Sequence, residues 1–162
     1  MGASIEEARR ALQAVNRLRG VTIATVRAAP ADKMDWAPVE GMFTFGDQAR
    51  HIAASQELYT DMALGKPVQP RRPSRDAYAS QSAIVAYLTE SNARAQAALA
   101  ALPPAELERT VTMPRSGTML PVISLLWRMA GHEEHHKGSL FVYLRLLGVT
   151  PPSWWEATLG KT

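Results

Sequence analysis

The sequence predicts an all-α protein that folds as a single domain over residues 1–162, an up-down four-helix bundle. Three observations lead to this prediction: four long segments have helical character, proline or glycine separates each from the next, and no internal repeat divides the chain. A chain of 162 residues can bury an apolar core of its own without disulfides or structural metals. Helices of this length can pack their apolar stripes into one core, as a four-helix bundle requires.

The first two helices are expected over residues 4–29 and 44–65. Ser4 opens a capping-box pattern, with a glutamate three residues later, and Pro30 ends the first segment because proline cannot continue a helix. Thr44 precedes an aspartate by three residues and is the candidate N-cap of the second segment. A glycine closes that segment and a proline follows shortly after it, as is common beyond a helix C-terminus.

The third and fourth helices are expected over residues 74–102 and 121–147. The third has an alanine-rich body, which favours a helix, and two consecutive prolines follow it. Pro121 suits the first turn of the fourth helix, and Gly148 suits its end. Residues 108–120 lie between these helices and contain a turn-like Pro-Arg-Ser-Gly sequence. The pattern permits a small hairpin or an irregular loop, and we expect a loop.

The composition narrows the possible functions. The chain has no cysteine, which excludes disulfides and thiolate metal ligands and leaves nitrogen and oxygen as ligand atoms. The net charge is +3, but the basic residues are scattered. Their one cluster, Arg71, Arg72 and Arg75, has no interleaved aromatic residues to stack on bases. We therefore expect no nucleic-acid partner.

The expected location is the cytoplasm. Glu6 and Glu7 stand where a signal peptide would carry basic residues before an apolar run. Arginines and the histidine-glutamate cluster interrupt the most apolar stretch, residues 121–148, which therefore falls short of the roughly 20 apolar residues of a membrane span. We expect a soluble protein with no membrane segment.

Three of the four histidines, His132, His135 and His136, lie close together in the last predicted helix. His132 and His136 are one helical turn apart and interrupt the apolar stripe, whereas His135 falls at its flank and is a poorer candidate ligand. Core histidines satisfied by hydrogen bonds are the alternative. Two inward-facing imidazoles are costly to bury together, and a bound cation would accept both lone pairs. The pattern therefore predicts a metal site.

His51, in the second predicted helix, is the candidate third ligand because it lies at the border of that helix's inward face. Three protein nitrogens and one open position are typical of catalytic rather than structural metal sites. Asp47, one turn earlier, could orient His51, although we expect it to act as a first-turn acid favoured by the helix dipole. Tyr143 shares the stripe of His136 and is expected in the core, with a pocket-lining position as the alternative.

Glu133 gives the cluster the sequence His-Glu-Glu-His-His, which contains the zincin pattern of two histidines four residues apart with a glutamate after the first. Glu133 would then be the general base of a protease. The alternative is a solvated charge on the helix surface. No other feature of the chain suggests a metalloprotease, so protease chemistry is a minor alternative.

These residues resemble the DinB-like family of metal-binding four-helix bundles, which is named for a DNA-damage-inducible protein. The strongest similarity is the last-helix pattern of His132, three residues, His136, then a basic residue and a glycine. Residues 34–38, the segment around His51 and residues 148–152 add to it. The resemblance covers most of the chain.

The resemblance implies that His51, His132 and His136 hold one divalent ion, since the family commonly uses one histidine from helix two and two from helix four. The family resemblance and the helical spacing therefore predict the same three metal ligands. Lys137 replaces the family's usual arginine and Ser139 its usual glutamine, so any role of those two family side chains does not carry over.

Two functions follow as hypotheses. The first is a metal-dependent enzyme that acts on a small-molecule substrate, either a hydrolase or a thiol S-transferase, since some relatives resemble transferases or isomerases that use bacillithiol, mycothiol or glutathione. The second is a non-enzymatic, stress-associated homodimer with a structural ion, to which Trp154 and Trp155 would add apolar surface. Zinc or nickel is the expected metal, with iron or manganese as alternatives.

Overall fold

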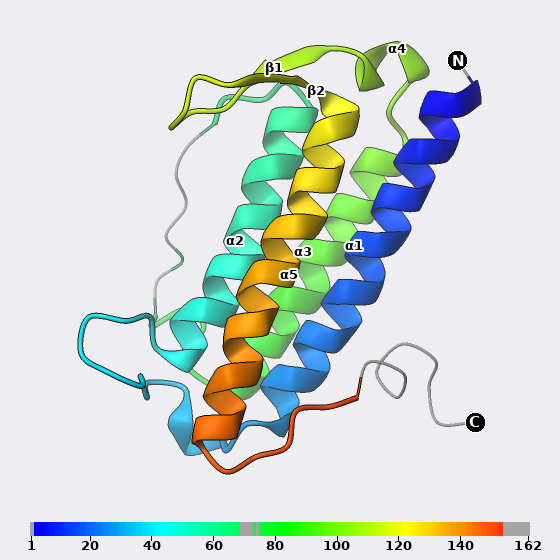
Figure 1. Ribbon diagram of the computed structural model, residues 1–162. Helices are drawn as coiled ribbons and strands as arrows, with labels where there is room; N and C mark the ends of the chain where they lie inside the picture. The colour runs from blue at the N-terminus through cyan, green and yellow to red at the C-terminus, as the bar shows by residue number, and fades with distance from the viewer. Residues whose placement is uncertain (1, 69–72, 74, 154–162) are drawn as a thin grey trace.

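The computed structural model describes residues 2–68, 73 and 75–153. It confirms the all-α four-helix bundle (Figure 1). The bundle helices are α1 (Gly2–Ala28), α2 (Phe45–Ala63), α3 (Gln81–Ala100) and α5 (Val122–Leu146). The shorter elements are the 3-10 helix η1 (Ala31–Lys33), helix α4 (Pro104–Leu107) and strands β1 (Thr110–Thr112) and β2 (Met119–Pro121).

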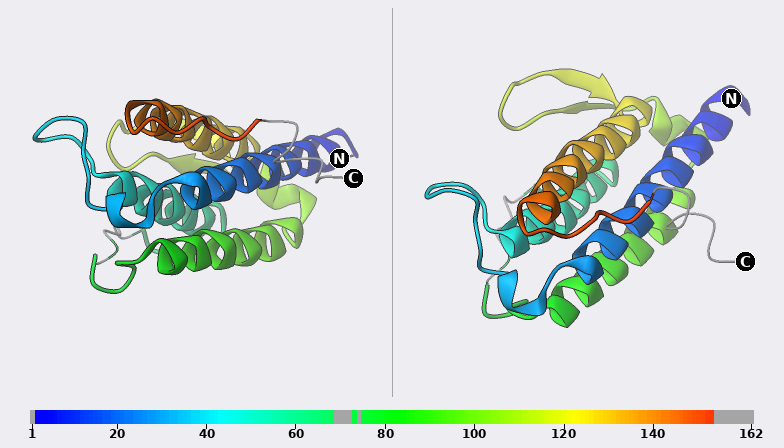
Figure 2. Two further views of the ribbon diagram at one scale, coloured as in Figure 1. Left: turned by 90° about the horizontal axis from the view of Figure 1, so that it is seen from below. Right: turned by 60° about the horizontal axis from the view of Figure 1, so that its bottom comes forward.

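The order in which the chain connects the helices differs from simple up-down alternation at one step. α1 and α5 run in one direction, and α2 and α3 both run in the other (Figures 1 and 2). α1 packs against α3 and α5, and α2 packs against the same two helices, so α1 and α2 occupy opposite corners of the bundle. Because α2 and α3 are parallel, the connection between them has to span the length of the bundle.

Local signals in the sequence locate several helix ends. The Thr44 hydroxyl accepts a hydrogen bond of 3.0 Å from the Asp47 backbone N–H, which confirms the predicted N-cap of α2. Gly65, just beyond the end of α2, has a φ of +67°. Gly148 follows α5 with a φ of +76°. Glycine adopts this left-handed conformation without the steric cost that other residues incur, which is why it commonly follows a helix.

Two predicted helix starts are wrong. α1 already begins at Gly2, and the Ser4 hydroxyl donates to the Glu108 carboxylate instead of capping the helix. α3 begins at Gln81 rather than near Ser74, because Ser80 provides the cap by accepting a hydrogen bond from a backbone N–H three residues later. Two serines, Ser74 and Ser80, lie between α2 and α3, and sequence pattern alone does not identify which of them caps α3.

The expected loop at residues 108–120 is also wrong, because β1 and β2 form an antiparallel hairpin in which Val111 lies opposite Leu120. Val111 is buried against one end of the bundle core while its neighbours in β1 are exposed. Gly117 has a φ of +65° in the turn. Met113 is buried in the same cluster, and Leu120 packs against it. The hairpin is therefore held by a few apolar side chains and a glycine turn, a signal that is weak over three-residue strands.

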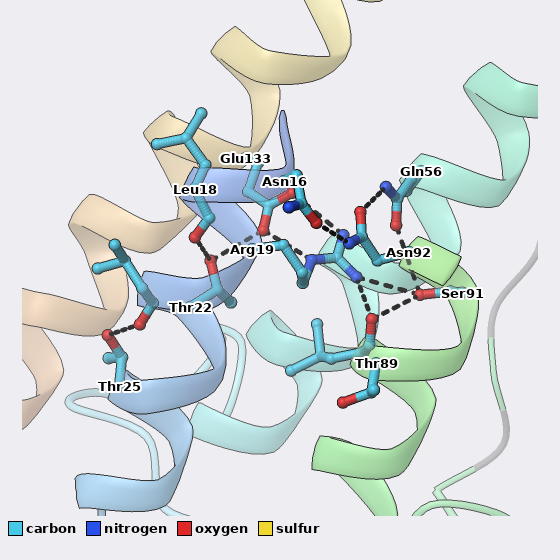
Figure 3. A network of polar contacts seen from close by, with 12 residues as sticks. Asn16, Leu18, Arg19, Thr22, Thr25, Gln56, Thr89, Ser91, Asn92 and Glu133 are labelled. Atoms are coloured by element: carbon cyan, nitrogen blue, oxygen red, sulfur yellow. Dashed lines mark hydrogen bonds and ion pairs between the residues drawn. The ribbon is translucent and has the colours of Figure 1, made fainter. Parts of the chain in front are cut away.

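The core consists of two apolar clusters, one towards each end of the bundle, with a layer of polar side chains between them. Figure 3 shows this layer, which joins all four helices. Its main hydrogen-bonding residues are Asn16, Arg19, Thr22, Gln56, Ser91, Asn92 and Glu133.

Arg19 and Glu133 form the centre of the polar layer. Arg19 Nε donates to Glu133 Oε1 at 2.7 Å and Arg19 Nη2 to Oε2 at 3.1 Å, a bidentate pair between side chains that are 1% and 2% exposed. The Leu88 carbonyl and the Ser91 hydroxyl accept from Arg19 Nη1, and the Thr22 hydroxyl donates to Glu133. Glu133 is therefore neither a protease base nor a solvated charge, because its carboxylate is committed to a buried cation.

Other predictions fall at the surface or outside the described residues. Arg75 pairs with Asp47. Arg71, Arg72, Trp154 and Trp155 lie outside the described residues. Within the described part of the chain, no helix has both the length and the apolar character needed to cross a membrane.

Glu133→Ala is expected to lower the free energy of unfolding by about 3–5 kcal/mol, because Arg19 would remain buried without its anion. Glu90→Ala is the control, since Glu90 and Arg94 form an exposed pair on α3, and about 0–0.5 kcal/mol is expected there. Urea unfolding followed by circular dichroism measures both variants. Equal effects of the two substitutions would contradict a dominant role for the buried pair.

Candidate metal centre

The structure brings the three predicted ligands together. His51 comes from α2, His132 and His136 come from α5, and one ring nitrogen from each lies within 4.8 Å of the others. The ring centroids are 5.0 Å apart for His51 and His132, 4.6 Å for His51 and His136, and 4.4 Å for His132 and His136. All three residues are half-buried. That they bind a metal stays a prediction.

The cluster forms because α2 and α5 are antiparallel neighbours. The spacing of His132 and His136 places both rings on the face of α5 that packs against α2. Aromatic rings flank the cluster: the Tyr59 ring meets His132 edge-on at 5.6 Å, and the Phe43 ring lies 5.5 Å from His51. These rings cover part of the cluster and leave the histidines partly accessible.

Gln48 contacts the cluster directly, although it is not among the residues predicted from the sequence. Its Nε2 lies 2.8 Å from His136 Nδ1, and the residue is only 5% exposed. Ser55 Oγ is 3.5 Å from His51 Nε2, a much longer contact. The signal that could have identified Gln48 is its position one turn before His51 on the inward face of the same helix.

Burial keeps the three imidazoles neutral. It lowers the pKa of His132 to about 3 and that of His136 to about 4, and the other histidines of the cluster add to both shifts. The pKa of His51 is also lowered, first by burial and then by the positive charge of Arg115 in the hairpin turn. A neutral imidazole has a free lone pair, which is the form that binds a metal.

Asp47 does not orient His51. Its carboxylate accepts a hydrogen bond of 2.9 Å from Arg50 and also pairs with Arg75. Partial burial opposes ionisation of Asp47, but the hydrogen bonds from Arg75 and Arg50 outweigh it and lower the pKa to about 2. Asp47 is therefore a first-turn acid of α2, as expected, and it anchors two arginines.

His135 and Tyr143 lie outside the ligand set. His135 is exposed at the flank of α5, with its ring centroid 4.9 Å from that of His136, in agreement with its expected position. Tyr143 is a core residue, 3% exposed, and its hydroxyl donates to the Phe43 carbonyl at 3.0 Å. Tyr143 thus holds the chain just before α2 against α5.

The donor set fits a divalent transition-metal ion. Three imidazole nitrogens suit zinc, nickel or iron better than magnesium or calcium, which prefer oxygen ligands. The acidic residues near the histidines in the sequence form ion pairs with basic side chains: Asp47 with Arg50 and Arg75, Glu133 with Arg19, and Glu134 with Lys137.

Three solved structures share the fold of this chain. The crystal structure of the DinB-like protein YjoA from Bacillus subtilis has 21% identity and a TM-score of 0.69, covering 90% of this chain and 96% of its own. A DinB-like protein from Bacillus cereus ATCC 10987 has 19% identity and a TM-score of 0.74, covering 88% and 94%. YfiT from Bacillus subtilis has 18% identity and a TM-score of 0.72, covering 88% and 89%.

YfiT is described as a probable metal-dependent hydrolase with an unusual four-helix bundle topology. Comparison with curated proteins gives no significant match. The family model of the DinB superfamily matches residues 4–140, which include all three histidines. The match covers well over half of the sequence, and the chain therefore belongs to the DinB superfamily.

Proposed function

We propose that this protein is a metal-dependent enzyme that acts on a small molecule, with His51, His132 and His136 as the ligands of one divalent ion. The observation that carries the proposal is the convergence of three neutral, half-buried imidazoles from two helices. This arrangement leaves a position for a fourth, exchangeable ligand. The description of YfiT as a probable metal-dependent hydrolase supports the hydrolase form of the proposal.

The ion would lower the pKa of a bound water or thiol and so supply a nucleophile near neutral pH. The histidines hold it from two helices, while Phe43 and Tyr59 cover the flanks of the cluster. Because Glu133 is paired with Arg19, the zincin-type base is not available. Hydrolysis is the favoured reaction, and a low-molecular-weight thiol at the same position would make the protein an S-transferase.

The alternative is a non-enzymatic, stress-associated homodimer in which the ion joins α2 to α5. Val142 and Leu146, one turn apart on α5, are 57% and 60% exposed and offer an apolar strip to a second copy of the chain. The two proposals differ in whether the fourth coordination position of the ion is open to another ligand. A structural ion is closed to added ligands, whereas a catalytic ion exchanges one.

Purified protein that has not passed through a metal-affinity column is expected to carry about one divalent ion per chain, the stoichiometry of a single three-histidine site. His51→Ala and His132→Ala should each remove most of it, because each deletes one of three ligands. His135→Ala is the matched control, since His135 lies outside the cluster, and it should retain the metal. Elemental analysis measures all four samples. A metal-free wild type that folds cooperatively would refute the proposal, and zinc, nickel, iron and manganese are distinguished in the same measurement.

Cobalt-substituted protein is expected to change its absorption spectrum when a small thiol such as 2-mercaptoethanol is added, because a thiolate entering an open position gives a new sulfur-to-metal charge-transfer band. The control is the His132→Ala variant with the same cobalt concentration, which should show no protein-dependent band. An unchanged spectrum of the cobalt-loaded wild type would favour the structural ion. Sedimentation of the same samples then tests the dimer.

The metal-free protein is expected to lose stability as the pH falls from about 7 towards about 4. His132 and His136 have folded-state pKa values of about 3 and 4, below the usual value of about 6.5 in an unfolded chain, so the unfolded chain binds more protons over this interval. Urea unfolding at several pH values measures the slope of the free energy of unfolding against pH. The double variant His132→Gln, His136→Gln should show a shallower slope, and equal slopes would contradict the assignment.

A further inference from the structure

The side chain of Gln48, on α2, makes a short contact with His136, a candidate metal ligand on α5. The side chain is 5% exposed and reaches across the helix interface, with 2.8 Å between its Nε2 and His136 Nδ1. The corresponding contact of Ser55 with His51 is 3.5 Å. A buried carboxamide in hydrogen-bond contact with a ring nitrogen fixes where that ring carries its proton.

The position of this proton decides whether His136 can bind an ion. A neutral imidazole carries one N–H, and the other nitrogen has the lone pair. Because Gln48 occupies Nδ1, the nitrogen of His136 left for the ion is Nε2, which requires the proton on Nδ1. The amide must then accept from Nδ1–H through its Oε1, an orientation related to the present one by rotating the carboxamide half a turn.

We propose that Gln48 is a positioning residue of the metal centre: its Oε1 accepts the Nδ1–H of His136 when the ion is bound and so directs the Nε2 lone pair towards the ion. This inference rests on the proposed metal site. With Nε2 of Gln48 towards the ring, the amide donates to Nδ1 and holds the proton on Nε2, which blocks ligation. The two amide orientations thus select the non-binding and the binding tautomer of one ligand.

The burial of Gln48 makes this contact difficult to replace. A water molecule could take the place of an exposed partner, but the amide lies in the interface between α2 and α5. The Phe43 and Tyr59 rings lie against His51 and His132 and supply aromatic contact rather than an acceptor for His136. Loss of the amide oxygen would leave the Nδ1–H of His136 without its acceptor at the moment of metal binding.

The test compares three variants for zinc affinity, measured by competition with a chromophoric chelator. Gln48→Leu removes the acceptor and is expected to weaken zinc binding by about 10- to 100-fold. Gln48→Glu keeps an acceptor oxygen at the same reach and is expected to retain the affinity. Gln56→Leu is the matched control, because Gln56 is equally buried on the same helix but bonds to Asn92 rather than to a histidine.

A second readout does not depend on any variant folding. In the zinc-loaded wild type, nitrogen-15 NMR of the histidine rings should show His136 protonated at Nδ1, with that proton slow to exchange. Zinc bound through Nδ1 of His136, or equal zinc affinities for wild type and Gln48→Leu, would overturn the inference and leave the metal site intact. A wild type that binds none of zinc, nickel, iron and manganese would overturn the proposed function itself, and the inference with it.

Discussion

The buried ion pair between Arg19 and Glu133 determines how α5 is rotated about its own axis. Breaking such a pair leaves an uncompensated charge in the core, so the helix cannot turn away from this contact without a large loss of stability. Glu133 faces α1, and its neighbours in the sequence therefore face elsewhere. With Glu133 held towards α1, His132 and His136 are directed at α2, where His51 lies.

On α5, the polar layer and the histidine cluster share one stretch, because Glu133 lies between His132 and His136 in the sequence, and this stretch separates the residues of the two apolar clusters. The apolar residues on either side supply the burial that lowers the pKa values of His132 and His136. The Arg19–Glu133 pair is buried among the same apolar residues, which shield it from water and so preserve its bidentate geometry. Charge pairing towards α1 and neutral imidazoles towards α2 are thus two results of the packing around one stretch of α5.

The sequence predicts what is periodic and local. His132 and His136 could be assigned to one face from their spacing, and Thr44 could be assigned as a cap from the aspartate that follows it. Glu133 could not be interpreted correctly, because its partner Arg19 is far away in the sequence and a glutamate in a polar run usually lies at the surface. The parallel course of α2 and α3 depends on tertiary packing, for which no local pattern exists, and the same holds for the reach of Gln48 across the interface.

The two halves of the histidine cluster are separated by about half of the chain, and the second half lies on the last helix of the bundle. During synthesis at the ribosome, α1, α2 and α3 are complete before α5 emerges. His51 alone offers a single nitrogen, so the site with three nitrogens does not form in a nascent chain until α5 has docked against α2. An ion that needs all three imidazoles would therefore be acquired only after α5 has docked, and it would tie α5 to α2 by closing a long loop.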